Sequence, residues 1–520
     1  MYQVGYFLTR NATMFPDRVA VISNDRQLTY AELNRAANRL ANNLSKLGIK
    51  KGDRLAFLLP NSIEIIILWH ATQKIGATAL PINLRYHASE IVGILKDSAS
   101  RILVHGTRLL EMVRDEVLPE CPGIEQVFYV STDGRTGLGR ELSPLIESGD
   151  EREPWVDLSG DDESVILYTS GTSGNPKGVM HTQQMVKEFS YMLALEACPA
   201  NEPQTVLVFS PIYHLGGIQH IWRTIALCGT LVLLRKMYAE DVLEYIEKYH
   251  VTEFFLLPPI LIKRLYDCPD KNEYDLSSVK TVMCAGGKCS CDISRMIFEM
   301  FPNCKIRLSY GSTETFCPTT SYVTKEMIAE RPELATSIGK INAQNEIRLV
   351  DAKNNDVQDG EPGEALVRSP MLFRGYLNLP EKNKKVLEQD GWFHTEDVMK
   401  RSSDGYYFVV DRIKDMIKSG GENVYAQEVE SILRDFPDIV DCAVIGLPDP
   451  EMEEGVAAAI VTRDGNPLDA QTFLDECRAN MASYKKPRYW AFMKELPTNS
   501  IGKIQKSVLR EHPEWFERIG

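Results

Sequence analysis

The sequence lacks the marks of several protein classes. Its eleven cysteines include no Cys-x-x-Cys pair, and Cys289 and Cys291 are separated by a single residue, so the spacing typical of zinc sites is absent. We therefore expect reduced, buried thiols of a cytosolic protein. Lysine and arginine number 58 against 72 aspartates and glutamates, a formal net charge of −14. This balance argues against a general nucleic-acid binder, which needs a basic face.

Long apolar runs and targeting signals are also missing. The run Ile65–Trp69 is far too short to span a bilayer. The N-terminal residues contain no basic segment followed by an apolar stretch and a cleavage site. These absences predict a cytoplasmic protein with no transmembrane segment.

What the chain does contain is the composition of an ordinary globular protein, with 44% hydrophobic and 25% charged residues over 520 positions. This length predicts at least two domains. Short apolar runs alternate with amphipathic helical stretches through the first 310 residues, which predicts parallel sheets covered by helices on both faces. The expected strands are residues 54–59, 205–210, 230–234, 253–257, 280–284 and 305–308, and the expected helices include 31–47 and 239–249.

The pattern changes after about residue 340. Residues 346–350, 363–368 and 406–410 are separated by turn signals such as Asp359-Gly360 and Asp404-Gly405, which predicts a small antiparallel unit. From residue 414 onward the pattern indicates a compact α+β region, with helices near 426–434 and 469–481.

The most informative motif is a loop of hydroxyls and glycines that follows the apolar run Val165–Leu167. It reads Tyr168-Thr-Ser-Gly-Thr-Ser-Gly-Asn-Pro-Lys-Gly178. Glycines let the backbone approach an anion closely, and N–H groups, hydroxyls and a lysine can then surround phosphate oxygens. Its residue order differs from that of the G-x-x-x-x-G-K-[ST] loop. We predict a phosphate cradle rather than a plain turn, formed by Thr169, Ser170, Gly171, Thr172, Ser173 and Lys177.

This loop resembles the signature of the adenylate-forming superfamily, which includes acyl-CoA synthetases, peptide-synthetase adenylation domains and firefly luciferase. Further motifs follow in that family's order, namely Tyr310-Gly-Ser-Thr-Glu-Thr315, Asp397, residues 411–421 and Asn499-Ser-Ile-Gly-Lys503. The resemblance therefore covers nearly the whole chain. It implies an α/β fold with a large N-terminal domain (residues 1–411) of parallel α/β sheets plus the small antiparallel unit. A small, mobile α+β C-terminal domain (residues 412–520) would follow.

The resemblance also implies how a nucleotide is bound. Tyr310 would face adenine, Gly286 and Gly287 would line its other side, and Asp397 would hold the ribose hydroxyls. The family more often has Thr-Gly-Asp where this chain has Thr395-Glu396-Asp397, so Glu396 is the alternative ligand. The residues that we expect to bind ATP or AMP are Thr169, Ser170, Gly171, Thr172, Ser173, Lys177, Gly286, Gly287, Tyr310, Gly311, Thr313, Asp397, Arg412 and Lys503.

Four residues would carry the chemistry of the reaction. They are Lys503, Thr172, Glu314 and His214. Glu314 would ligate Mg²⁺, because a carboxylate beside a triphosphate is tolerated through a hard cation. Lys503 would stabilise the negative charge that builds up during adenylation. We interpret His214 as a wall of the acyl site that orients the carboxylate, since a carboxylate nucleophile has no proton to remove.

The later motifs imply a hinge and a coenzyme A site. Lys414 would be the hinge about which the C-terminal domain turns, although a basic strand end at the surface is equally consistent with the sequence. The residues expected near coenzyme A are Lys418, Gly420, Gly421, Lys485 and Lys486. For Lys485 and Lys486, a solvated face is nearly as good an interpretation.

These features predict an ATP-dependent acid–thiol ligase that forms an acyl-adenylate and then an acyl-CoA, most simply on a fatty acid. The co-substrates would be ATP, coenzyme A and a small carboxylic acid, with Mg²⁺ as cofactor. Alternatives are an aryl-acid ligase similar to 4-coumarate–CoA ligases, an amino-acid adenylating enzyme, or a silent nucleotide-binding regulator on the same fold. Arg223 could in principle clamp a second carboxylate, but an exposed arginine is the commoner outcome.

Overall fold

The computed structural model describes residues 4–24, 26–169, 176–197, 204–419, 422–498 and 504–519. The chain forms two compact units. The first comprises Met1–Glu346 and Val367–Phe393, and the second Ile347–Leu366 and His394–Gly520. The division of the chain after Asp411, expected from the sequence, remains a prediction.

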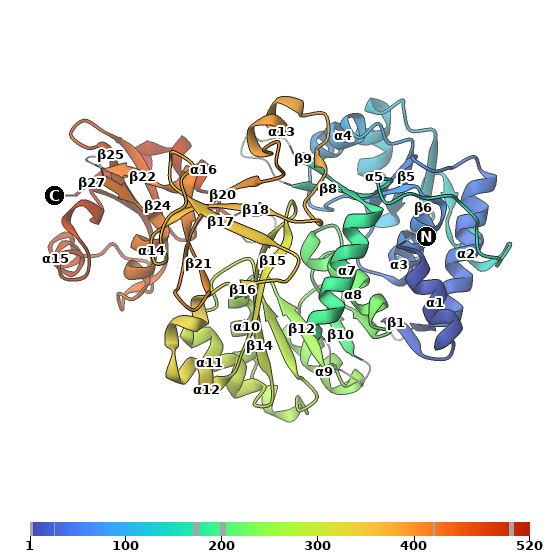
Figure 1. The fold of residues 1–520 in the computed structure, drawn as a ribbon, viewed down its shortest axis with the longest axis horizontal. Coiled ribbons are helices and arrows are strands. Elements are labelled where there is room, and N and C mark those ends of the chain that lie inside the picture. Colours follow the sequence, from blue (N-terminus) through green and yellow to red (C-terminus); the bar gives the residue numbers. More distant parts are fainter. Residues whose placement is uncertain are drawn as a thin grey trace. The chain divides into compact units, whose positions relative to one another are not determined.

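The first unit contains two large sheets whose central strands are parallel (Figure 1). In the larger one the strand order among the described residues is β16-β15-β14-β13-β12-β10-β11-β1-β2. The run from β14 to β1 is parallel, and the antiparallel pairs lie at the two edges. Its strands are β1 (Val19–Ser23), β2 (Arg26–Thr29), β10 (Thr205–Val208), β11 (Thr230–Leu233), β12 (Glu253–Leu256), β13 (Thr281–Cys284), β14 (Lys305–Ser312), β15 (Phe316–Val323) and β16 (Lys340–Ile341).

The second sheet of this unit has the order β19-β9-β8-β4-β3-β5-β6-β7 among the described residues. The strands from β8 to β7 are parallel, whereas β9 and β19 are added antiparallel at one edge. Its strands are β3 (Arg54–Leu58), β4 (Thr78–Pro81), β5 (Ile102–Gly106), β6 (Gln126–Val130), β7 (Arg140–Glu141), β8 (Glu163–Thr169), β9 (Lys177–Thr182) and β19 (Gly375–Tyr376). The prediction of parallel α/β sheets is confirmed.

One continuous core joins the two sheets through α3 (Ile63–Ile75), α7 (Gln183–Ala197) and α8 (Leu215–Ala226). Helices α7 and α8 lie side by side (Figure 1). Trp69 of α3 and Trp222 of α8 have ring centroids 5.8 Å apart. All but one of the side chains of α3 are buried, so the run Ile65–Trp69 belongs to a core helix. In the described part of the chain, no helix is long and apolar enough to cross a membrane.

Local sequence explains where the longest helix begins. Helix α2 (Tyr30–Lys46) starts with a reciprocal pair of bonds, in which Thr29 Oγ1 accepts from Glu32 N and the Glu32 carboxylate accepts from Thr29 N. Such a capping box satisfies two backbone donors that the first turn leaves open. The other helices of the unit are α1 (Tyr6–Met14), α4 (Ala88–Asp97), α5 (Leu110–Met112), α6 (Ser143–Glu147), α9 (Ala239–Tyr249), α10 (Ile262–Tyr266), α11 (Cys291–Met300), α12 (Lys325–Glu330) and α13 (Pro380–Val386).

The remaining elements form the small antiparallel unit and the C-terminal α+β region. One sheet has the order β17-β18-β20-β21, and another has β23-β22-β25-β26-β27 with β24 paired to β25. Helices α14 (Ala426–Arg434), α15 (Ala470–Asn480) and α16 (Lys506–Glu511) accompany them. The strands are β17 (Glu346–Val350), β18 (Gly363–Arg368), β20 (Phe393–Arg401), β21 (Tyr407–Arg412), β22 (Ile417–Ser419), β23 (Glu422–Val424), β24 (Ile439–Asp449), β25 (Glu453–Thr462), β26 (Tyr489–Phe492) and β27 (Glu517–Arg518).

The cysteines of the described residues are free thiols. Only Cys291 among them is exposed, and the others are buried. This agrees with the expectation of reduced core cysteines.

Candidate active site

The two ends of the predicted phosphate loop are fixed by an antiparallel hairpin. Thr169 is the last residue of β8 and Lys177 the first of β9, and the two are paired in register. The loop residues Ser170, Gly171, Thr172 and Ser173 lie outside the described residues. Of the residues predicted to form the phosphate cradle, the structure therefore describes only Thr169 and Lys177.

A tyrosine that the sequence did not single out connects Lys177 with Glu314. Tyr376 of β19 is buried, and its hydroxyl donates a hydrogen bond of 2.8 Å to Glu314 Oε1. The Lys177 ammonium lies 5.8 Å from the centroid of the same ring. Strand pairing places Tyr376 opposite Val179 of β9. We call these three residues the Lys177–Tyr376–Glu314 cluster, and it brings two predicted site residues together.

Glu314 is carried by a tight turn between β14 and β15. Ser312 Oγ accepts hydrogen bonds from Glu314 N at 3.2 Å and from Thr315 N at 3.3 Å. The turn needs glycine at Gly311, because a Cβ there would stand 1.6 Å from the carbonyl oxygen of Phe316. Phe373 N also donates to Glu314 O at 2.9 Å. Backbone and side chain of Glu314 are thus both held by residues 373–376.

The other predicted residues of this motif occupy the same strand end and turn. Tyr310 lies in β14 opposite Thr319, and Thr313 lies within the turn. Both side chains are half-buried. The place of Tyr310 at adenine and the part of Thr313 in binding ATP or AMP remain predictions.

The glycine pair after β13 lies against the chain that follows β12. Gly286 has a φ of +71°, a backbone angle that favours glycine. A Cβ there would stand 2.2 Å from Leu257 Cδ1, so the Leu257 side chain would have to shift. Gly287 faces Pro258 and Pro259, which a Cβ would meet at an ordinary 3.4 Å. The backbone that we predict to line adenine therefore packs closely against residues 257–259, at the carboxyl ends of β12 and β13.

His214 precedes α8 and is largely enclosed. Burial, with the nearby charge of Arg85 as a second cause, lowers its pKa to about 4, so the ring is neutral at pH 7. Its Nε2 atom is buried and has no hydrogen-bond partner among the described residues. Its ring lies edge-on to Tyr213, with centroids 4.8 Å apart. A neutral imidazole with an open ring nitrogen can donate one hydrogen bond to an incoming ligand.

Aromatic rings form the wall beside the turn of Glu314. Phe316 is fully buried and stacks on Phe189 of α7, with centroids 4.4 Å apart and planes at 7°. His181 also stacks on Phe316, and their ring centroids are 4.4 Å apart. Burial lowers the pKa of His181 to about 3. The segment Thr315–Cys317 is buried and belongs to the core.

Arg223 differs from the expectation of an exposed arginine. Its side chain is 3% exposed, and its guanidinium forms a two-pronged ion pair with Glu253, of which the Nη2–Oε2 bond is 2.7 Å. The reason is that residues 217–225 of α8 are all buried, so the charge of Arg223 needs a partner, and Glu253 at the start of β12 supplies it. The positive charge of Arg223, which we considered as a clamp for a second carboxylate, is therefore paired with Glu253.

Asp397 and Arg412, predicted at the ribose, are neighbours in the structure. They are opposite each other in β20 and β21, and Arg412 Nε lies 2.9 Å from Asp397 Oδ1. Asp397 is buried, whereas Glu396, the alternative ligand, is exposed. Glu396 also has a φ of +60°, which is the backbone conformation that the more usual glycine would adopt at low cost. Glu396 thus takes, within β20, a backbone conformation that favours glycine.

The predicted hinge and coenzyme A residues have different surroundings. Burial is the main cause that lowers the pKa of Lys414. Lys418 is exposed, and its backbone N–H donates to Glu454 at 2.7 Å. Lys485 Nζ forms an ion pair of 2.6 Å with Glu428, which outweighs the effect of burial and raises its pKa. Lys486 follows it and is half-buried, and Gly420, Gly421 and Lys503 lie outside the described residues.

Two sequence families account for most of the chain. Residues 8–377 match the family described as AMP-binding enzyme, and residues 428–503 match the AMP-binding enzyme C-terminal domain. The chain is 32% identical over 518 residues to the long-chain-fatty-acid–CoA ligase FadD13 of Mycobacterium tuberculosis, covering 98% of both proteins. It is also 32% identical over 511 residues to a feruloyl-CoA synthase of an Amycolatopsis species, again covering 98% of both. Among solved structures, ATP-bound MatB from Rhodopseudomonas palustris superposes with a TM-score of 0.87 at 28% identity, covering 98% of both chains.

Proposed function

The chain belongs to the family of AMP-binding enzymes, and from that premise we propose that it joins a fatty acid to coenzyme A in two steps. The enzyme is an AMP-forming acid–thiol ligase, as its relatives are. In the first step the carboxylate attacks the α-phosphorus of ATP, and pyrophosphate leaves. In the second, the thiol of coenzyme A attacks the acyl carbonyl, and AMP leaves with the former carboxylate oxygen. Dividing the reaction into two steps gives the acyl group AMP as its leaving group, in place of the oxygen of the free carboxylate, which leaves poorly.

The observation that carries the choice of acid is the Arg223–Glu253 ion pair. A second carboxylate on the substrate would need a cation near the acyl site. Arg223 of α8 is paired with Glu253 and does not serve as that cation, although the charge of Arg85 reaches His214. Ile212 and Tyr213, which precede His214, are buried, and Leu257 lies against Gly216. Such a lining favours an uncharged tail.

His214 supports a role in binding the reacting carboxylate. Its pKa of about 4 keeps the imidazole neutral at pH 7, and Nε2 has no hydrogen-bond partner in the described part of the protein. The nitrogen is free to donate to one carboxylate oxygen while the other attacks. No proton has to be removed from a carboxylate nucleophile, so the ring acts by orientation.

The Lys177–Tyr376–Glu314 cluster fits a site for triphosphate and Mg²⁺. Tyr376 donates to one oxygen of the Glu314 carboxylate, so the other oxygen can ligate a cation, and Mg²⁺ needs only one or two protein oxygens beside phosphates and water. Bound there, the metal would neutralise phosphate charge. Lys177 contributes a cation at the start of β9, and Tyr376 fixes the orientation of Glu314. We assign Lys503 to the charge that develops during adenylation, by its place in the Asn499–Lys503 motif.

An aryl acid is the second candidate, favoured by the equal identity of the chain to FadD13 and to the feruloyl-CoA synthase. A panel of acetate, octanoate, palmitate, ferulate, malonate and carnitine, followed by coenzyme A consumption and AMP release, tests both. We expect the highest kcat/KM for octanoate or palmitate. A clear preference for ferulate would select the aryl alternative, and a preference for malonate or carnitine would refute the proposal of an uncharged tail. Absence of ATP–pyrophosphate exchange with every acid would indicate a silent regulator instead.

A further inference from the structure

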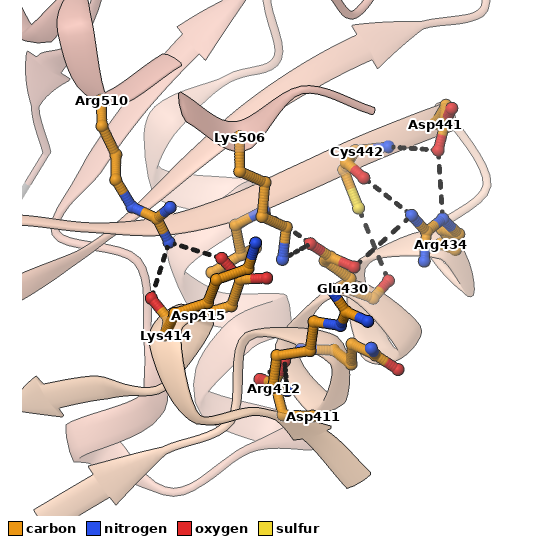
Figure 2. A network of polar contacts seen from close by, with 12 residues as sticks. Asp411, Arg412, Lys414, Asp415, Glu430, Arg434, Asp441, Cys442, Lys506 and Arg510 are labelled. Atoms are coloured by element: carbon orange, nitrogen blue, oxygen red, sulfur yellow. Dashed lines mark hydrogen bonds and ion pairs between the residues drawn. The ribbon is translucent and has the colours of Figure 1, made fainter. Parts of the chain in front are cut away.

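The segment around the predicted hinge is fastened at both ends. On one side, Arg412 is paired with Asp397 across β20 and β21. On the other side, Asp415 Oδ1 lies 2.8 Å from Arg510 Nη2, and the same guanidinium donates to the carbonyl oxygen of Lys414 at 3.3 Å (Figure 2). Arg510 belongs to α16, near the C-terminus.

A second contact fastens α16 to α14. Lys506 Nζ lies 2.7 Å from Glu430 Oε1, and the two side chains are only 14% and 8% exposed (Figure 2). The Glu430 carboxylate also accepts from Val444 N at 2.9 Å, so it is fixed to β24 as well. A helix of six residues has little stability of its own. Its position comes from these ion pairs together with Leu509, which is fully buried in the core beside β24.

The chain on either side of residues 499–503 is also held. Thr498 and Ile504 form an isolated antiparallel bridge, and Gln505 N donates to Pro497 O at 2.7 Å. The described chain resumes at Ile504, and α16 begins two residues later. Lys503 is thus joined by a very short linkage to the helix that Lys506 and Arg510 hold in place.

Acidic groups near the predicted hinge lie close to the two cations of α16. Burial opposes ionisation of Asp415, but its bond with Arg510 and the charge of Lys506 lower its pKa, so the carboxylate is charged at pH 7. Lys506 also acts on Asp411, whose pKa burial raises. Two cations of α16 therefore face a group of acids supplied by the hinge side and by α14. Loss of either cation would leave these partly buried acids with less positive charge to balance them.

We propose that Lys506 and Arg510 are positioning residues for adenylation, because they fasten α16 to Glu430 and to the hinge segment at Asp415. This fastening holds α16, which begins three residues after Lys503 in the sequence, next to the hinge segment, and it makes α16 move together with Asp415 when the hinge turns. The pivot is then confined to Ile413 and Lys414, between the Asp397–Arg412 and Asp415–Arg510 pairs. The inference rests on the proposed role of Lys503.

The test compares the two half-reactions in full-length variants. Adenylation is followed by ATP–pyrophosphate exchange, and thioester formation by release of AMP from a supplied acyl-adenylate. For Arg510→Met and Lys506→Met we expect kcat of adenylation to fall at least tenfold, with KM for ATP and the rate of thioester formation changed less than about twofold. Arg510→Lys, which can keep the ion pair to Asp415, should recover most of the adenylation rate.

Arg434→Met is the matched control. Arg434 lies 3.7 Å from the same Glu430 and 3.1 Å from Asp441, but it belongs to α14. It should leave the ratio of the two half-reactions unchanged. An equal loss of both half-reactions in Arg510→Met, or the same selective loss in Arg434→Met, would overturn the inference. If Arg510→Met does not fold, Asp415→Asn tests the same contact from its other side.

Lys503→Ala separates this inference from the proposed function. If Lys503→Ala retains adenylation, the assignment of Lys503 is wrong, and the positioning role falls with it. If Lys503→Ala loses adenylation alone while Arg510→Met and Lys506→Met do not, the proposed function stands and only the fastening by α16 is refuted.

Discussion

Replacing Tyr376 by phenylalanine removes the hydrogen bond that its hydroxyl donates to Glu314 in the Lys177–Tyr376–Glu314 cluster. The aromatic ring stays, so its contact with the Lys177 ammonium at 5.8 Å is retained. The 2.8 Å bond to Glu314 Oε1 is lost. If Glu314 ligates Mg²⁺, the variant enzyme must order this carboxylate without help when the metal binds.

The size of the effect follows from the kind of bond. A hydrogen bond to a charged acceptor contributes about 1.5–3 kcal/mol. Glu314 is only half-buried, and solvent screens the interaction, so the lower end, about 1.5 kcal/mol, applies. Because about 1.4 kcal/mol corresponds to a factor of ten, we expect the Mg²⁺ concentration for half-maximal ATP–pyrophosphate exchange to rise roughly tenfold. The maximal rate at saturating Mg²⁺ should change little.

Tyr489→Phe is the control for this experiment. Tyr489 donates a hydrogen bond of 2.9 Å to the Asp449 carboxylate, a contact of the same chemical kind in the C-terminal region. Its removal should leave the Mg²⁺ dependence of exchange unchanged. An unchanged Mg²⁺ curve for Tyr376→Phe would refute the role of Tyr376 in orienting Glu314, and an equal shift in both variants would refute the link to the cluster.

Two further predictions concern stability. Arg223→Met should lower the free energy of unfolding by about 3–5 kcal/mol in urea melts at pH 7, because it leaves Glu253 buried without its partner; Arg223→Met combined with Glu253→Gln should recover most of this loss, and no recovery would contradict the ion-pair explanation. Burial lowers the pKa of His70 to about 3, so the unfolded chain binds a proton below about pH 6.5 that the folded protein does not, and stability present above pH 6.5 is lost as the pH falls toward 3. His70→Met should therefore lose about 2–3 kcal/mol less than the parent protein between pH 7 and pH 4.5, and parallel pH profiles of the two urea midpoints would refute this reasoning.

Much of the fold can be predicted from local sequence patterns. The expected helices at 239–249 and 426–434 coincide with α9 and α14, and the expected strands at 346–350 and 363–368 coincide with β17 and β18. These elements have a clear apolar period and end at turn or capping residues, which act over a few positions. The pairing of β19 with β9 could not be predicted, because a strand of two residues has no period and its partner lies far away in the sequence.

The candidate site, like the fold, could be predicted from the sequence only in part. Motif order identifies Lys177, Glu314 and Asp397, but nothing in the sequence near Tyr376 indicates that its hydroxyl reaches Glu314. The burial of Arg223 was missed for a related reason, since its partner Glu253 lies on a strand that α8 covers only after folding. Roles assigned from motifs thus depend on short-range order, whereas the contacts that orient them depend on tertiary pairing.

The two-residue strand β19 has a consequence for how the protein is made. It covers the open edge of the β8–β9 hairpin, yet the ribosome synthesises it long after that hairpin. A nascent chain that ends before Gly375 presents the edge of β9 unpaired, and unpaired edges recruit other strands. The same chain has Glu314 without Tyr376. Fragments truncated before Gly375 should therefore self-associate, and during translation the Lys177–Tyr376–Glu314 cluster can close only after most of the chain has left the ribosome.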